Sequence, residues 1–107
     1  MSARLTPQAV RDRDAALTYQ RRYYGADATI KMRAAFSEVF KRIGGWSPPG
    51  ATREEFADKK YRWVPVAPYP YNVVWTFGDS ESDRVIVRVL QAHMDLKAAM
   101  QGTEPWF

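Results

Sequence analysis

The sequence contains no cysteine and only one histidine, His93. Without cysteine the chain can form no disulfide, no thiolate nucleophile and no cysteine-based metal site. A conventional zinc site needs several cysteine or histidine ligands, which a single imidazole cannot supply. We therefore expect neither a metal nor another cofactor.

Long apolar runs are also missing. No stretch approaches the roughly 18 apolar residues of a membrane-spanning helix, and the N-terminus has no apolar signal region. The 107 residues suffice for one core but not for two, and an apolar content of 46% with 14% aromatic residues is that of a folded chain. The sequence thus predicts a single cytoplasmic domain over residues 1–107, with a peripheral tail at about 101–107 and no membrane partner.

The balance of charge is basic, with a formal net charge of +4 and a sequence pI near 9.6. Such a balance favours a nucleic acid, a ribonucleoprotein or an acidic protein as partner. It is equally typical of an ordinary solvated surface, so charge alone leaves these alternatives open.

The first half of the chain carries two helical patterns. Thr6 followed by Pro7 predicts the start of a helix that ends at Gly25, and Asp27 predicts the start of a second helix that ends at the glycines 44–45. Apolar residues recur at helical spacing in the first helix at Ala9, Ala16, Tyr19 and Tyr23, and in the second at Met32, Ala35, Phe36, Val39, Phe40 and Ile43. The connection at Gly25 is so short that the two helices should form an antiparallel hairpin.

The second half carries strand patterns. Apolar and polar residues alternate over 59–66 and 71–77, and 84–90 is a β-branched run interrupted only by Arg88, which is typical of a buried strand. Residues 3–5 can add an edge strand. Because short connections make neighbouring strands antiparallel, the expected fold class is α+β, with the helical hairpin packed on a three- to four-stranded antiparallel sheet.

Three short segments complete the expected fold. Residues 52–55 fit a capping box, which predicts a short helical turn before Asp58. Asp95 is expected to cap a last helical turn at 96–100. The aromatic residues 106–107 are unusually apolar for a tail, and we expect them to fold back on the body rather than to wait for a partner.

Short elements in a characteristic order lie between Leu5 and Leu96. They are Ala9 with Asp12, Phe36, Pro48 or Pro49 with Gly50, Tyr61-Arg62, Pro70-Tyr71 before Val73-Val74-Trp75, and Arg88-Val89-Leu90 followed by Asp95-Leu96. In this order they resemble the ParE/RelE superfamily, the toxins of bacterial type II toxin–antitoxin modules. The predicted hairpin before a sheet, and the ending Arg-Val-Leu before Asp-Leu, are closer to ParE.

This resemblance implies a function. ParE-type toxins poison DNA gyrase, whereas RelE-type toxins cut mRNA on the ribosome. In both groups a cognate antitoxin wraps the toxin. Here we expect a ParD-like antitoxin, a ribbon–helix–helix protein with a disordered tail, and we expect the complex to bind operator DNA only through that antitoxin. We therefore expect a gyrase inhibitor that acts by binding. The alternatives are a ribosome-dependent mRNA interferase and a degenerate toxin that acts only as an antitoxin-binding subunit.

One segment departs from the family. Many ParE-like members follow Arg-Val-Leu with histidine, a small residue and two arginines, whereas this chain has Gln91, Ala92, His93 and Met94. The departure leaves open whether the chain still engages the family's target.

Candidate contact residues follow from the resemblance. The residues expected to contact the target are Lys59, Lys60, Arg62, Arg88 and His93, and those expected to contact the antitoxin are Trp63, Tyr69, Tyr71 and Trp75. Cutting RNA would need a base, an acid and cations for the scissile phosphate, for which Arg62, Arg88 and His93 are the candidates, although no catalytic set is predicted. Each has a structural alternative, since the two arginines can pair with carboxylates such as Asp95 and a lone histidine is often a surface residue.

Overall fold

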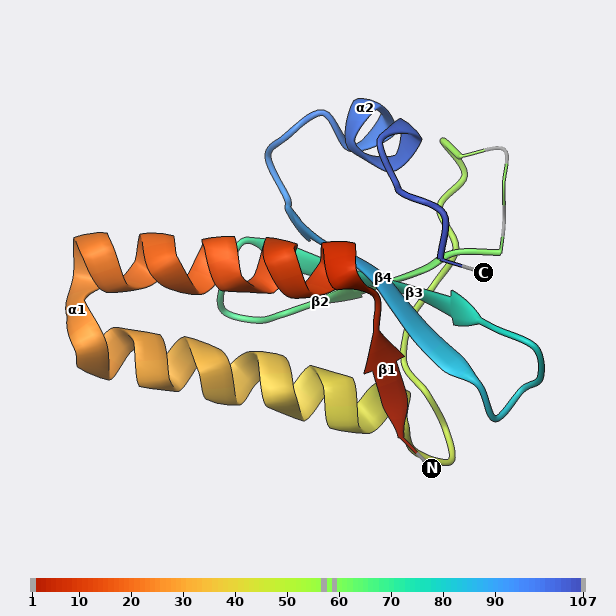
Figure 1. Ribbon diagram of the computed structural model, residues 1–107, viewed down its shortest axis with the longest axis horizontal. Helices are drawn as coiled ribbons and strands as arrows, with labels where there is room; N and C mark the ends of the chain where they lie inside the picture. The colour runs from red at the N-terminus through yellow and green to blue at the C-terminus, as the bar shows by residue number, and fades with distance from the viewer. Residues whose placement is uncertain (1, 57, 59, 107) are drawn as a thin grey trace.

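In the computed structural model, residues 2–56, 58 and 60–106 are described, and Lys59 and Phe107 lie outside this range. The elements follow the order β1 (Ala3–Leu5), α1 (Pro7–Ile43), β2 (Arg62–Pro65), β3 (Tyr71–Phe77), β4 (Arg84–Gln91) and α2 (Leu96–Gln101). Figure 1 shows α1 laid along one face of the sheet, with α2 on the opposite side. The predicted α+β class is confirmed.

The start of α1 is set by Thr6, whose hydroxyl accepts a hydrogen bond from the Ala9 amide at 3.1 Å, with Pro7 at the first helical position. Helical geometry is interrupted at Gly25, where φ is 89° and ψ is 178°. Only glycine adopts this conformation without strain, and it reverses the chain so that the two arms of α1 run side by side (Figure 1). The predicted hairpin is met in part: the reversal lies at Gly25, but the two arms belong to one helical element, Pro7–Ile43, so the helix end predicted at Gly25 falls inside that element.

The sheet has the strand order β1-β4-β3-β2. β2 pairs with β3 and β3 with β4 in antiparallel fashion, as predicted, but β1 runs parallel to β4. The expectation of a wholly antiparallel sheet is therefore wrong at this edge. The expectation rested on short connections, but residues 6–83 lie between these two strands, so the long crossover that a parallel pair needs is available.

Both faces of the sheet are covered, which explains why β4 is buried from Arg84 to Leu90. The first face packs against α1, through residues that include Val73, Trp75 and Ile86. The second face carries Trp63, Val74, Val85, Val87 and Leu90, and it is covered by Phe56, Tyr61, α2 and Trp106. The prediction that the tail folds back is thus confirmed for Trp106.

Of the two short helical turns predicted from the sequence, only the one after Asp95 is present. Asp95 caps α2, because its carboxylate accepts from the Ala98 amide at 3.1 Å, as predicted. Residues 52–56 form a single hydrogen-bonded turn, from the Phe56 amide to the Arg53 carbonyl, instead of the predicted helical turn. Within the part of the chain that the structure describes, no helix is both long enough and apolar enough to cross a bilayer.

Candidate functional site

A buried ion pair joins three elements beside the sheet. The Nε atom of Arg88 on β4 lies 2.7 Å from the Oδ2 atom of Asp12 on α1, and the Val89 amide donates to the same oxygen at 3.0 Å. A further donor of the guanidinium, Nη1, reaches the carbonyl oxygen of Ala99 on α2 at 2.6 Å. The structural alternative for Arg88 is thus realised, but with Asp12 as the carboxylate and not with Asp95, which caps α2.

Next to this pair, a groove lies between the first arm of α1 and the ends of β3 and β4. Two adjoining hollows, of about 460 and 280 Å³, share Tyr19, Tyr71 and Gln91 among their lining residues. We call this the tyrosine groove, and define it by Tyr19, Tyr24, Tyr69, Tyr71, Gln91 and Met94. Arg88 and Asp12 line one end of it. Aromatic rings with polar tips beside a flexible thioether are well suited to contact a peptide.

Tyr71 is a half-buried tyrosine of the groove that also packs against the core. Its ring meets that of Phe36 edge to face at 5.8 Å between centroids. Burial raises the pKa of its hydroxyl above the usual value, with a smaller contribution from Tyr19. At neutral pH the hydroxyl is therefore protonated and can donate a hydrogen bond to a partner.

Sequence patterns did not single out the helical side of this groove. Tyr19 and Tyr23 were assigned to the apolar stripe of the first helix, but their side chains are 54% and 59% exposed, and Tyr24 is 66% exposed. The rings of Tyr19 and Tyr23 lie 4.6 Å apart instead of entering the core. Three tyrosines within six residues at the end of a helix arm were the available signal, since tyrosine is common at interfaces.

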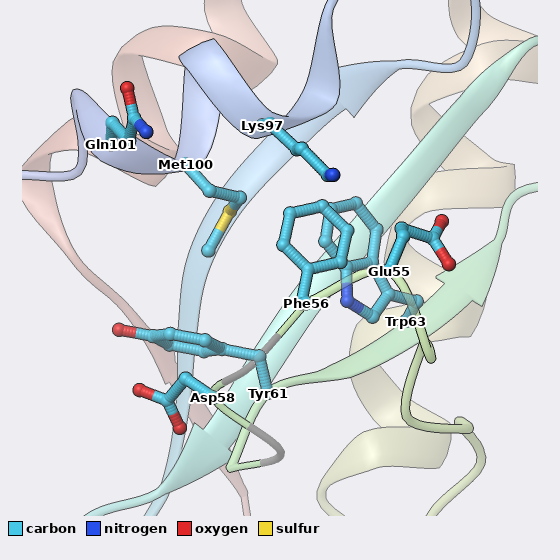
Figure 2. Close-up of a pocket in the computed structure, with 8 residues that line it drawn as sticks. All are labelled: Glu55, Phe56, Asp58, Tyr61, Trp63, Lys97, Met100 and Gln101. Carbon is cyan, nitrogen blue, oxygen red and sulfur yellow. The ribbon is translucent and has the colours of Figure 1, made fainter.

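A second cleft opens on the other face of the sheet, between α2 and the segment before β2. Its volume is about 430 Å³, and it is lined by Glu55, Phe56, Asp58, Tyr61, Trp63, Lys97, Met100 and Gln101 (Figure 2). The rings of Phe56 and Trp63 are stacked at 5.1 Å, and Figure 2 shows Met100 reaching from α2 toward Tyr61. We call this the α2 cleft.

The charged rim of the α2 cleft is largely neutralised by its own neighbours. The Lys60 ammonium lies 5.0 Å from the centre of the Tyr61 ring and 3.7 Å from the Asp58 carboxylate. Glu55 pairs with Arg53 at 3.5 Å. Because these pairs are exposed, they contribute little to stability.

The residues expected to contact the target are dispersed over several elements. Lys60 borders the α2 cleft, whereas the Arg62 guanidinium lies over the rings of Trp75 and Phe77, at 5.8 and 5.7 Å. Arg88 is buried, and His93 is exposed in the turn after β4. Lys59, also expected there, lies outside the described residues. The described members of this set form no single catalytic cluster.

The residues expected to contact the antitoxin divide into two pairs. Trp75 is fully buried and donates from Nε1 to the Pro49 carbonyl at 2.9 Å, and Trp63 is 5% exposed. Their rings belong to the core, so a partner that kept this fold could reach little of either. Tyr69 and Tyr71 are half-buried and lie together in the tyrosine groove.

No group of three or more histidine and acidic side chains suited to a metal ion occurs among residues 2–56, 58 and 60–106. The tyrosine groove and the α2 cleft, lined by half-buried aromatic rings and polar groups, are suited to contact with a macromolecule.

The fold is similar to that of a chain from the chromosomal ParDE toxin–antitoxin system of P. aeruginosa. The TM-score is 0.71 at 19% sequence identity, and the match covers 87% of this chain and 97% of that chain. No protein-family model and no curated protein matches the sequence. At this identity the likeness concerns the fold.

Proposed function

We propose that the chain is the toxin of a type II toxin–antitoxin module, of the ParE kind, which inhibits DNA gyrase in the cytoplasm by binding and is neutralised by a ParD-like antitoxin. The observation that carries the proposal is the likeness of fold to a chain of a ParDE system, over nearly the whole of both chains. The sequence elements that resemble the superfamily lend it independent support. Two of them, Asp12 and Arg88, form the buried pair that joins α1, β4 and α2.

The tyrosine groove supports an antitoxin contact. A disordered antitoxin tail that folds on binding needs an exposed apolar surface with hydrogen-bonding groups, and Tyr69 and Tyr71 present such a surface. An acidic tail would be attracted by the net charge of +4. In this proposal the rings of Trp63 and Trp75, which are buried in the core, contribute to the fold and not to the antitoxin contact itself.

The state of the candidate catalytic groups supports the proposal that the chain acts by binding and not by catalysis. The Arg88 guanidinium is already engaged by Asp12 and the Ala99 carbonyl, so it offers little to a scissile phosphate. His93, Lys60 and Arg62 remain accessible to a target. Lys59, which lies outside the described residues, is proposed to contact the target as well. These residues lie on separate elements, which suits an extended contact better than an active site.

The proposal is tested by inducing the chain alone and together with a neighbouring gene for a ribbon–helix–helix protein. Growth arrest that the second gene relieves, with loss of supercoiling by purified gyrase, is the expected result. Normal growth together with unaffected gyrase would contradict it. Cleavage of translated mRNA at the ribosomal A site, measured by primer extension, would instead identify an mRNA interferase, and complex formation without growth arrest would identify a degenerate toxin.

A further inference from the structure

Trp46 is 94% exposed, although tryptophan is among the residues that proteins usually bury in large part. It lies in the loop between the end of α1 and the bridge at Ala51. A single exposed apolar residue on a mobile loop would need no explanation. The loop around Trp46, however, is fixed on both sides.

On the N-terminal side, the buried Arg84 holds the loop. Its Nη1 atom donates to the carbonyl oxygen of Ile43 at 2.6 Å and also to that of Gly45. Gly44 lies so close to β1 that an added Cβ would be 2.8 Å from the Ser2 Cα atom. The residues directly before Trp46 are thus anchored to two strands of the sheet.

On the C-terminal side, the Pro49 carbonyl accepts the indole N–H of the fully buried Trp75 at 2.9 Å. Gly50 has a φ of 126°, and an added Cβ would lie 3.0 Å from both the Trp75 Nε1 atom and the Arg62 Cβ atom. Pro48 and Pro49 further restrict the backbone. The indole of Trp46 is therefore presented from a pre-organised loop, which lowers the entropy that a partner must remove on binding.

The charges around Trp46 indicate the kind of partner. Lys41 and Arg42, both exposed, occupy the last turn of α1. The acidic turn 79–83 lies beside the loop, because Arg84 also donates from Nε to the Glu81 carbonyl at 3.1 Å. Three acidic residues in this turn, Asp79, Glu81 and Asp83, disfavour a polyanion such as a nucleic acid or an anionic membrane, whereas a protein surface can match charges of both signs around the indole that it buries.

The position of Trp46 separates it from the tyrosine groove. The groove draws on Tyr19 and Tyr24 near the tip of the two arms, whereas the loop follows the opposite end of the second arm, near the N-terminus of the chain (Figure 1). Arg62, which is expected to contact the target, lies next to this loop, because a Cβ added at Gly50 would be 3.0 Å from the Arg62 Cβ atom. A partner in the groove would leave Trp46 free.

We propose that Trp46, with Lys41 and Arg42, forms a second partner surface, and that its partner is a protein with an apolar pocket for the indole and carboxylates facing the two basic residues. The inference rests on the proposed function, in which the partner that binds Trp46 is gyrase, the target of the toxin. Trp46 supplies most of the affinity there, as exposed aromatic anchors do in other interfaces. The antitoxin occupies the tyrosine groove and does not need the indole.

The test compares Trp46→Ala with Tyr23→Ala, which removes another exposed aromatic ring on the side of the hairpin tip. Binding of each full-length variant to purified gyrase and to the purified antitoxin is measured by surface plasmon resonance. Trp46→Ala is expected to weaken gyrase binding about tenfold or more and to leave antitoxin affinity within about twofold. Tyr23→Ala should leave gyrase affinity within about twofold. An unchanged melting temperature of Trp46→Ala shows that the loop still folds, and Trp46→Phe should restore part of the affinity.

Each other outcome overturns the inference in a recognisable way. If the unaltered chain binds gyrase and Trp46→Ala binds it equally, the inference is wrong and the proposed function stands. Equal loss of gyrase and antitoxin binding would show that Trp46 does not form a separate surface. Failure of the unaltered chain to bind gyrase would overturn the proposed target and this inference together.

Discussion

The carboxylate of Asp12 and the guanidinium of Arg88 meet at 2.7 Å, although 75 residues separate them in the sequence, and Arg88 also reaches the backbone of α2 through Ala99. Their side chains are 17% and 11% exposed. One ion pair thus fixes the first arm of α1, the central strand β4 and the covering helix relative to one another. The tyrosine groove opens directly beside it.

Replacing Asp12 with alanine should therefore destabilise the fold strongly. The change leaves the Arg88 guanidinium and the Val89 amide without their acceptor, and an unpaired buried charge costs roughly 3–5 kcal/mol. Urea denaturation followed by far-UV circular dichroism measures the free energy of unfolding. The matched control is Arg11→Ala, which breaks the exposed pair with Glu104 and should cost no more than about 1 kcal/mol. Similar losses in the two variants would contradict the structural role of the buried pair.

A second prediction concerns the reversal of α1 at Gly25. Its φ of 89° with ψ of 178° strains any residue that has a Cβ, although no atom lies within 4 Å of the position a Cβ would take. Gly25→Ala should therefore lower the free energy of unfolding by roughly 1–3 kcal/mol through backbone strain alone. Gly102→Ala is the control, because Gly102 has a φ of −83° and only ordinary contacts around an added Cβ, so its stability should change by less than about 0.5 kcal/mol. Thermal unfolding of both variants decides between strain and a general intolerance of alanine at helix ends.

Local patterns were sufficient for most of the fold. The cap at Thr6, the reversal at Gly25, the cap at Asp95 and the buried run of β4 each depend on neighbouring residues, and each was predictable from them. The parallel pairing of β1 with β4 could not be predicted in this way, because it depends on the path of the chain between these two strands and not on the three residues of β1.

The candidate site was predicted less completely for a similar reason. The resemblance led us to expect Trp63 and Trp75 at the antitoxin contact, but both rings are buried because helices or loops cover both faces of the sheet. Helical spacing placed Tyr19 in the core, whereas the groove leaves it half-exposed. Neither burial nor exposure of an aromatic ring follows from spacing alone when several layers compete to cover it.

Tyr71 provides a prediction about pH. Because burial raises its pKa in the folded state above the ordinary value of 10.0, the folded protein holds the phenolic proton more tightly than the unfolded chain does. The stability that Tyr71 contributes through its protonated hydroxyl is fully present below pH 10. It is lost as the pH rises through the pKa of the folded state, because the unfolded chain releases the proton more readily and is stabilised by doing so. Unfolding measured by urea between pH 8 and about 11 should show a decline that is smaller in Tyr71→Phe. An identical decline in both proteins would assign it to other groups.

The tyrosine groove can be tested apart from the rest of the surface. Tyr69 is half-buried in the groove, and Tyr69→Ala removes its ring from the contact expected with the antitoxin. Loss of an aromatic anchor at an interface typically costs roughly 1–2 kcal/mol or more, so the antitoxin should bind about tenfold more weakly, as measured by isothermal titration calorimetry. Tyr61→Ala is the matched control, because Tyr61 is also half-buried but lines the α2 cleft on the other face of the sheet, and its antitoxin affinity should stay within about twofold. The reverse order, with the larger loss in Tyr61→Ala, would place the antitoxin over the α2 cleft instead. Melting temperatures of both variants separate a lost contact from a disturbed fold, since each ring packs at the margin of its core cluster.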